Sequence, residues 1–251
     1  MTGRGAALVT GAGRRIGRAL ALEAARAGYD VAVHCLTSES EAEAVAGEIR
    51  ALGRRAVVLR ADLADEDQAR ALAGRAAEAL GPLTLLVNNA SVFEDDRVGS
   101  LDLATWDAHI ATNLRAPIVL SEAFAAQLPP GTDGLIVNLL DQRVWKPNPQ
   151  FFSYSLSKHA LWDATRMLAQ ALAPRIRVNG IGPGPTLPSS HQTEADFAAE
   201  ADNVLLRRRA TPEAVAQALR YLIEAELVTG QMIAVDGGQH LAWLTPDIVG
   251  E

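Results

Sequence analysis

The sequence is poor in the residue types that build disulfide and metal sites. Cys35 is the one cysteine among 251 residues, which excludes a disulfide within the chain. The five histidines form no HExxH motif, and no CxxC motif occurs. Both motifs are typical of protein zinc sites, so we predict no catalytic metal.

Long apolar runs and an excess of positive charge are also missing. No segment approaches the roughly 18 consecutive apolar residues that a membrane helix needs. The opening MTGRGAALVTGAG lacks a basic segment followed by a long apolar core. The formal net charge of -7 disfavours binding to nucleic-acid phosphates or anionic lipid. We therefore expect a soluble, cytoplasmic protein whose partner is a small molecule.

Hydrophobic residues, in contrast, make up 49% of the chain, enough for a sizeable core. We expect one domain over residues 1–251. Short apolar or β-branched runs alternate with longer amphipathic, alanine-rich segments, which is typical of repeated βαβ units. The expected strands are 6–10, 31–35, 56–60, 83–87, 134–139, 176–181 and 232–235.

Glycines mark where the first helices end. Gly28, Gly53 and Gly81 each follow an amphipathic segment, and a left-handed C-terminal cap favours glycine there. A long helix is expected over about 151–173, and another begins at Thr211. The fold class is thus α/β, a doubly wound Rossmann-like fold of about seven parallel strands with helices on both faces. Its ligands should bind at the carboxyl ends of the strands.

A glycine-rich turn, TGAGRRIG over residues 10–17, follows the first strand and opens into a helix. Gly11 and Gly17 permit a tight turn and close backbone approach, and a helix N-terminus attracts anions. The pattern predicts a cradle for a dinucleotide pyrophosphate. A simple structural turn is the alternative.

Arg14 and Arg15 lie at this helix start, where cations oppose the helix dipole unless an anion is bound. Thr37 and Ser38 follow the end of the second strand, where NAD-binding proteins usually place a carboxylate. We therefore predict NADPH over NADH, with Arg15, Thr37 and Ser38 around the 2′-phosphate. Glu39 counts against this hypothesis, and solvated arginines are the alternative.

Tyr154 and Lys158 are four residues apart, and so lie on one face of the long helix. Tyrosine has an ordinary pKa of about 10, and it transfers protons near neutral pH only if a neighbouring charge stabilises its phenolate. Lys158 is predicted to supply that charge and thereby to lower the pKa of Tyr154. An ordinary amphipathic helix with an extended lysine is the alternative.

Taken in order, these motifs resemble the short-chain dehydrogenase/reductase family over essentially the whole chain. Besides the glycine turn and Tyr154-x-x-x-Lys158, the resemblance rests on Asp62, Asn88-Asn89-Ala90, Asn113, Pro183-Gly184 and Asp236-Gly237-Gly238. It implies that Asp62 contacts the adenine, Asn89 and Ala90 the cofactor, and Lys158 the nicotinamide ribose. It implies that Asn113 serves a water relay. The full predicted cofactor set is Gly11, Arg14, Arg15, Ile16, Gly17, Thr37, Ser38, Asp62, Leu63, Asn89, Ala90, Ser91, Tyr154, Lys158, Pro183, Gly184 and Thr186.

One position departs from the family. Most members carry a serine thirteen residues before the tyrosine, and this chain has Asp141. A carboxylate repels a developing alkoxide, so Asp141 either is protonated or serves a substrate with N–H donors or a protonatable nitrogen. Pteridine reductases show the same exchange, and this chain also resembles them at Arg15, Ser91 and Phe93. Thr37 counts against this subgroup, because members with a basic cluster there have arginine.

The predicted reaction is therefore NADPH-dependent reduction of a dihydropterin. Its predicted catalytic residues are Asp141, Tyr154, Lys158 and Asn113, and its substrate residues are Arg15, Ser91, Phe93, Asp141 and Tyr154, with Phe93 stacking on the ring or serving only in packing. One alternative is a ketoreductase or secondary alcohol dehydrogenase acting on 3-oxoacyl or other small carbonyl compounds. A second is a non-catalytic NADPH-binding sensor. The resemblance also implies a homotetramer, and segment 183–202 is either a substrate flap or a plain loop.

Overall fold

Seven parallel strands form one sheet at the centre of the protein. The computed structural model describes residues 4–188, 193 and 203–243, and the strand order is β3-β2-β1-β4-β5-β6-β7. This confirms the predicted fold class, and each predicted strand overlaps an observed one. The strands are β1 (Ala6–Val9), β2 (Asp30–Cys35), β3 (Ala56–Arg60), β4 (Leu83–Asn88), β5 (Gly134–Leu139), β6 (Ile176–Pro183) and β7 (Met232–Val235).

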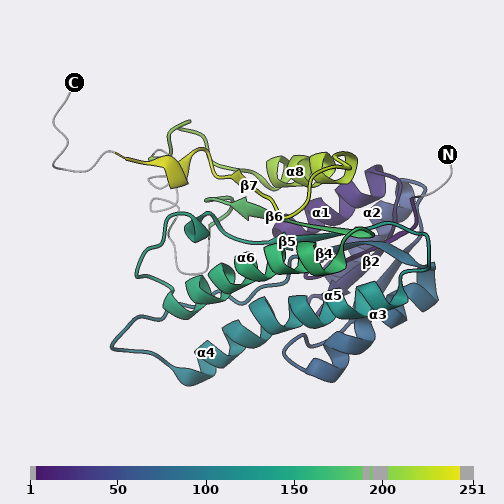
Figure 1. Ribbon diagram of the computed structural model, residues 1–251, viewed down its shortest axis with the longest axis horizontal. Coiled ribbons are helices and arrows are strands. Elements are labelled where there is room, and N and C mark those ends of the chain that lie inside the picture. Colours follow the sequence, from purple (N-terminus) through teal and green to yellow (C-terminus); the bar gives the residue numbers. More distant parts are fainter. Residues whose placement is uncertain (1–3, 189–192, 194–202, 244–251) are drawn as a thin grey trace.

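Helices cover both faces of the sheet (Figure 1). One face carries α1 (Arg15–Arg26), α2 (Glu39–Ala51) and α8 (Pro212–Glu224). The other carries α3 (Glu66–Leu80), α5 (Ala116–Gln127) and α6 (Phe152–Leu172). A short helix α4 (Leu103–His109) and a π-helical segment η1 (Ile110–Arg115) lead directly into α5, and two short 3-10 turns are η2 (Gln142–Val144) and η3 (Gln239–Leu241).

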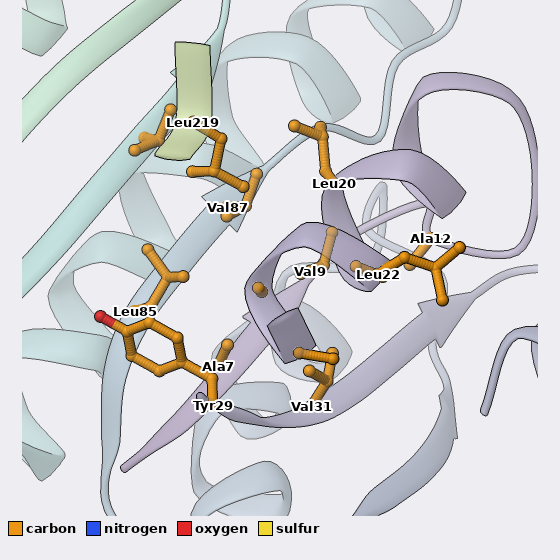
Figure 2. Close-up of a cluster of buried hydrophobic side chains, with 14 of the residues drawn as sticks. Ala7, Val9, Ala12, Leu20, Leu22, Tyr29, Val31, Leu85, Val87 and Leu219 are labelled. Carbon is orange, nitrogen blue, oxygen red and sulfur yellow. The ribbon is translucent and has the colours of Figure 1, made fainter. Parts of the chain in front are cut away.

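Apolar strand residues supply the core on both sides of the sheet. All four residues of β1 are buried, and successive side chains point to opposite faces. Ala7 and Val9 join the cluster with Leu20 of α1 and Leu219 of α8, which Figure 2 shows. Their neighbour Leu8 belongs to the cluster on the other face. The near-continuous apolar strands are what a sheet buried on both faces requires.

The glycines predicted to end the first helices all have positive φ angles, but Gly81, with ψ at -178°, lies outside the predicted left-handed helical region. Gly28, Gly53 and Gly81 have φ angles of 101°, 79° and 91°, each in a region that glycine adopts without a Cβ clash. The chain can therefore reverse direction directly after α1, α2 and α3. This confirms the sequence-based prediction of where these helices end.

No helix among residues 4–188 and 203–243 is long and apolar enough to cross a membrane. The same part of the chain contains no group of three or more histidine, cysteine or acidic side chains arranged to hold a metal ion.

The atoms around Gly17 leave no room for a side chain, and a substitution there tests how closely the backbone approaches in this turn. A Cβ atom at this position would lie 2.1 Å from the carbonyl oxygen of Gly11 and 2.6 Å from Nδ2 of Asn89. We expect Gly17→Ala to lower the free energy of unfolding by about 1–3 kcal/mol, because backbone must move to admit the methyl group. Urea unfolding measures this effect.

Gly47→Ala is the matched control, because no atom lies within 4 Å of its added Cβ and Gly47 is within α2. Alanine has the higher helix propensity, so this variant should gain up to about 1 kcal/mol. Equal effects at the two positions would contradict the assignment of Gly17 to a close backbone approach.

Candidate active site

Two cavities open where the strands end. The smaller has a volume of about 430 Å³ and is lined by segments that follow β1, β2, β3 and β4. The larger, of about 660 Å³, is lined by segments that follow β4, β5 and β6. Arg15, Ile16, Asn89 and Ser91 belong to the walls of both. The two cavities thus meet where the strand order reverses beside β1, which is where doubly wound folds bind ligands.

The start of α1 faces the smaller cavity without a side-chain cap. Arg14 precedes the helix and provides no capping bond, and the first turn contains no acidic residue. Asp65, in contrast, accepts two backbone N–H bonds at the start of α3. Gly11, with φ at 61°, makes the turn before α1. The free N–H groups and the positive end of the helix dipole therefore suit an anion.

His34, which sequence reasoning missed, holds this turn in place. Its Nδ1 accepts a hydrogen bond from the backbone N–H of Gly11 at 3.0 Å, and its Nε2 lies 3.1 Å from the carbonyl oxygen of Ala61. Burial lowers the pKa of His34 from 6.5 to about 4, so the imidazole is neutral near pH 7. A neutral ring can accept at one nitrogen and donate at the other, as both contacts require.

Thr10 and Asn89 tie the end of β4 to the glycine turn. Thr10 Oγ1 accepts hydrogen bonds from the backbone N–H groups of Asn89 and Ala90, at 2.9 and 3.0 Å. The Asn89 amide donates to the carbonyl oxygens of Thr10 and Gly11, at 2.8 and 3.1 Å. Asn89 and Ala90 thereby fix the wall between the two cavities.

The two arginines of the turn point to different places. Arg14 lines the smaller cavity together with Thr37 and Ser38. Arg15 has a left-handed φ of 54°, and its guanidinium donates to the carbonyl oxygens of Leu187 and Pro188, at 3.3 and 2.9 Å. Arg14, more than Arg15, therefore accompanies the hydroxyls that we predicted at a 2′-phosphate.

Asp62 and Leu63 also lie in the wall of the smaller cavity, after β3. Leu63 is buried, while Asp62 is half-buried and its Oδ1 accepts the N–H of Ala64 at 2.9 Å. Asp62 therefore shapes its turn and also faces the cavity.

Helix α6 brings Tyr154 and Lys158 into the larger cavity. The hydroxyl of Tyr154 donates to Oδ2 of Asp141 at 2.9 Å, and Lys158 Nζ donates to the carbonyl oxygen of Leu139 at 2.8 Å. The other oxygen of Asp141, Oδ1, accepts the backbone N–H of Arg143 at 2.8 Å. The carboxylate is therefore held by its own turn and aimed at the phenol.

The electrostatics of the pair differ from the sequence-based prediction. Burial, with the Asp141 carboxylate as second cause, raises the pKa of Tyr154 well above 10. Burial also lowers the pKa of Lys158 from 10.5 to about 8, although Asp141 opposes that shift. The prediction that Lys158 lowers the pKa of Tyr154 is thus wrong for this arrangement, in which the phenol is neutral at pH 7. A neutral phenol can donate a proton.

Asn113 is fully buried in η1. Its Oδ1 accepts from the backbone N–H of Val92 at 2.8 Å and from Ser91 Oγ at 3.1 Å. Its Nδ2 donates to Ser157 Oγ at 3.2 Å, next to Lys158 on α6. Asn113 thus fixes the loop after β4 against the helix that carries the candidate catalytic pair.

An aromatic wall closes one side of the larger cavity. Phe93 stacks on Phe151 with ring centroids 4.2 Å apart, and the ring of Tyr154 meets Phe93 edge-on at 4.7 Å. Phe151 has a left-handed φ of 51°, which is rare for a bulky residue. Such backbone conformations are most frequent at functional sites. Arg15, which also has a positive φ, lines the same cavity. Phe93 both packs and faces the cavity, whereas Phe151 was missed from sequence.

The loop after β6 lines the same cavity with Pro183, Gly184 and Thr186. A Cβ at Gly184 would lie 2.7 Å from the Cα of Asp236, so only glycine permits this approach to the turn after β7. Thr186 is buried, and its hydroxyl donates to the carbonyl oxygen of Gly184 at 2.9 Å. Most of the predicted flap and the chain end lie outside the described residues.

Lys158 yields a prediction in which stability and activity move in opposite directions. Its pKa of about 8 against an ordinary 10.5 means that the cation destabilises the folded state at pH 7. This difference in pKa corresponds to a destabilisation of the folded state by about 3 kcal/mol. Replacing the lysine also removes its hydrogen bond to Leu139, which costs the variant about 1 kcal/mol. We expect Lys158→Met to raise the free energy of unfolding at pH 7 by about 1–3 kcal/mol and to abolish activity.

The sign of the pH dependence checks this account. Because the folded pKa is lowered, the unfolded chain binds the extra proton between pH 8 and 10.5, and the cost of the cation shrinks as pH rises through that window. The advantage of Lys158→Met in urea unfolding should therefore narrow above pH 8. A variant less stable than the wild type at pH 7 would show that the charge is well solvated or paired.

Comparisons with known proteins identify the family of this chain. A family model described as short chain dehydrogenase matches residues 5–200. The 3-oxoacyl-[acyl-carrier-protein] reductase FabG of Staphylococcus aureus is 33% identical over 240 residues, covering 94% of this chain and 98% of that protein.

Solved structures extend the likeness. FolM alternative dihydrofolate reductase 1 of Brucella suis, in complex with NADP, is 53% identical with a TM-score of 0.95, covering 99% of this chain and 100% of that one. A short chain dehydrogenase of Burkholderia cenocepacia, also with NADP, is 36% identical with a TM-score of 0.89, covering 96% and 99%. With this fold, this site and these matches, the chain belongs to the short-chain dehydrogenase family.

Proposed function

We propose that the protein is an NADPH-dependent oxidoreductase that reduces a dihydropterin at a C=N bond. The observation that carries the substrate class is the 2.9 Å hydrogen bond from Tyr154 to Asp141, at the position where most of the family has serine. Tyrosine is thereby held as a neutral proton donor beside a carboxylate. This pairing suits a ring that offers N–H groups and takes up a proton at nitrogen.

The smaller cavity suits the phosphate groups of NADPH. The uncapped start of α1 would hold the pyrophosphate, and Arg14, Thr37 and Ser38 would hold the 2′-phosphate. Glu39, which counted against this cofactor in the sequence, does not line the cavity. The two related structures described above contain NADP. When bound, this cofactor supplies the hydride.

The larger cavity supplies the remaining functions. Tyr154 donates a proton to the substrate, and Asp141 orients the phenol and accepts hydrogen bonds from the ring. Lys158 keeps a positive charge beside the reacting atoms and binds the ribose. Phe93 offers an apolar face for the ring, and Asn113 holds the loop that carries Ser91.

A ketoreductase is the second candidate, because FabG of Staphylococcus aureus aligns with nearly the whole chain. Ketone reduction would form an alkoxide close to the negative charge of Asp141, which repels it. Asp141 also accepts the hydrogen bond of Tyr154, the residue that would have to protonate the alkoxide. A non-catalytic NADPH sensor is disfavoured by the assembled Tyr154, Lys158 and Asn113.

We also propose that the whole chain forms one domain, that the protein is cytoplasmic, and that it assembles as a homotetramer. The family resemblance supports this, together with the exposed apolar side chains of Leu103 and Met167 on α4 and α6. Light scattering on the purified protein tests it, and a monomeric mass would contradict it.

Two assays test the function. The first compares the rate of NADPH consumption with dihydrobiopterin and with a panel of acetoacetyl and other small ketones. Turnover of the pterin alone supports the proposal, and turnover of ketones alone supports the second candidate. The second compares NADPH with NADH, and equal kcat/KM values would exclude the proposed cofactor preference.

Arg14→Ala links the cofactor assay to the structure. We expect it to lower kcat/KM for NADPH by about 10-fold or more, because a charge-assisted bond to phosphate is lost, and to leave NADH unaffected. Arg26, exposed at the far end of α1, supplies the control Arg26→Ala, which should change neither value.

A further inference from the structure

Arg143 is half-buried in the wall of the larger cavity, and its guanidinium donates to no described residue. No described residue accepts a hydrogen bond from its guanidinium or pairs with it as a carboxylate within 4.0 Å. Its Nη1 atom is buried without a partner. A guanidinium carries five N–H donors and a permanent charge, so a buried and unpartnered one is unfavourable. The arrangement is one that a ligand would complete.

The position of Arg143 is fixed by its surroundings. Its backbone N–H donates to Asp141 at 2.8 Å, and the residue forms part of η2. Its Cζ lies 5.0 Å from the ring centroid of Phe151 and 5.7 Å from that of Phe93. Phe151 reaches this place through the left-handed backbone conformation at the start of α6. The cation is therefore held against the aromatic wall, next to the reacting groups.

The other arginines of the same cavity already have partners. Arg15 donates to two carbonyl oxygens of the loop after β6. Arg97 pairs with Asp95 at 3.3 Å. Arg143 is thus the one lining arginine with no acceptor among the described residues, and a carboxylate is the acceptor that satisfies both its charge and its planar donor pattern.

We propose that Arg143 determines substrate specificity by binding a carboxylate of the substrate, so that the preferred acceptor is a dihydropterin with a carboxylated side chain. This inference rests on the proposed function. The inference adds that the protein distinguishes anionic from neutral dihydropterins and that the side chain of Arg143 makes this distinction. The aromatic wall of Phe93 and Phe151 would lie between the pterin and its anionic group.

The test compares two substrates in the wild type and in three variants. Dihydrofolate carries carboxylates, and dihydrobiopterin carries none, so the second is an internal control for folding and chemistry. We expect Arg143→Gln to lower kcat/KM for dihydrofolate at least 10-fold, mainly through KM, and to change the value for dihydrobiopterin less than 3-fold. Arg143→Lys, which keeps the charge, should recover part of the loss.

Arg166→Gln is the matched control, because Arg166 also lies over an aromatic ring, with its Cζ 5.2 Å from the centroid of Trp162, but outside the cavity. It should leave both substrates unchanged. The charge of Arg143 also lowers the pKa of Tyr154, against the larger raising effect of burial. If that is its only role, Arg143→Gln slows both substrates equally.

Equal loss on both substrates, or no loss on either, overturns this inference and leaves the proposed function standing. A wild-type protein that reduces neither pterin overturns the proposed function, and the inference with it. A selective loss for dihydrofolate supports both.

Discussion

Tyr154→Phe reduces turnover of the dihydropterin by about 10²–10⁴-fold and leaves NADPH binding within a factor of about two. The variant removes one oxygen atom and keeps the ring, so the edge-on contact with Phe93 at 4.7 Å is retained. What is lost is the only described donor to Oδ2 of Asp141 and, in our proposal, the proton given to the substrate. Steady-state kinetics and a fluorescence titration with NADPH measure the two effects separately.

Tyr221→Phe is the matched control for this prediction. Tyr221 is exposed on α8 and lines neither cavity, and the variant removes the same atom there. Its activity should equal that of the wild type. If Tyr154→Phe kept more than a tenth of the activity, the phenol would not be the proton donor, and a water molecule or another acid would have to take that role.

Asp141→Ser restores the residue that most of the family carries and is expected to separate the two candidate substrates. Pterin turnover should fall by about 10²-fold or more, because the ring loses its acceptor, while ketone reduction should be unchanged or faster. The serine keeps a hydroxyl near Tyr154, so loss of folding is not the expected cause. Retained pterin turnover would contradict the assignment of substrate class to Asp141.

The same variant should also change the pH profile. Lys158 has a pKa of about 8, so its charge is present below pH 8 and lost as pH rises, and activity should decline above that value. Asp141 opposes the lowering of that pKa and also raises the pKa of Tyr154. Without the carboxylate both pKa values fall, and the alkaline decline moves to lower pH.

Asp163→Ser controls for the general effect of removing a negative charge. Asp163 is exposed on α6 and pairs with Arg166 one turn away. Its pH profile should match that of the wild type. An unchanged profile in Asp141→Ser as well would mean that Lys158 does not limit activity at alkaline pH.

Local rules allowed much of the fold to be predicted from the sequence. Glycine at the end of a helix, apolar alternation and the spacing of βαβ units are short-range features, and Gly28, Gly53 and Gly81 follow them. Tyr154 and Lys158 were also found, because a separation of four residues within a helix fixes their common face.

The parts that were missed depend on contacts between distant segments. Arg15 binds carbonyl oxygens more than 170 positions further along the chain, which no spacing rule anticipates. His34 serves the glycine turn from the neighbouring strand, and a single histidine in a strand forms no motif. Phe151 meets Phe93 only because its backbone is left-handed, a conformation that bulky residues rarely adopt.

The pKa of Tyr154 was mispredicted for a related reason. Sequence spacing places Lys158 near the tyrosine but does not show how deeply both are buried. In the structure burial is the largest cause of both shifts, and Asp141 reaches the phenol directly. The balance between desolvation and neighbouring charge is a property of the assembled cavity.

The most direct measurement of the central claim is hydride tracing with NADPH carrying deuterium at both C4 positions. After incubation with dihydrobiopterin and the protein, mass spectrometry should find one deuterium on a ring carbon of the tetrahydropterin, with one NADP formed per product. Labelled product should form about 10²-fold or more slowly when Tyr154→Phe replaces the wild type. Oxidation of NADPH without label in the pterin would contradict the account.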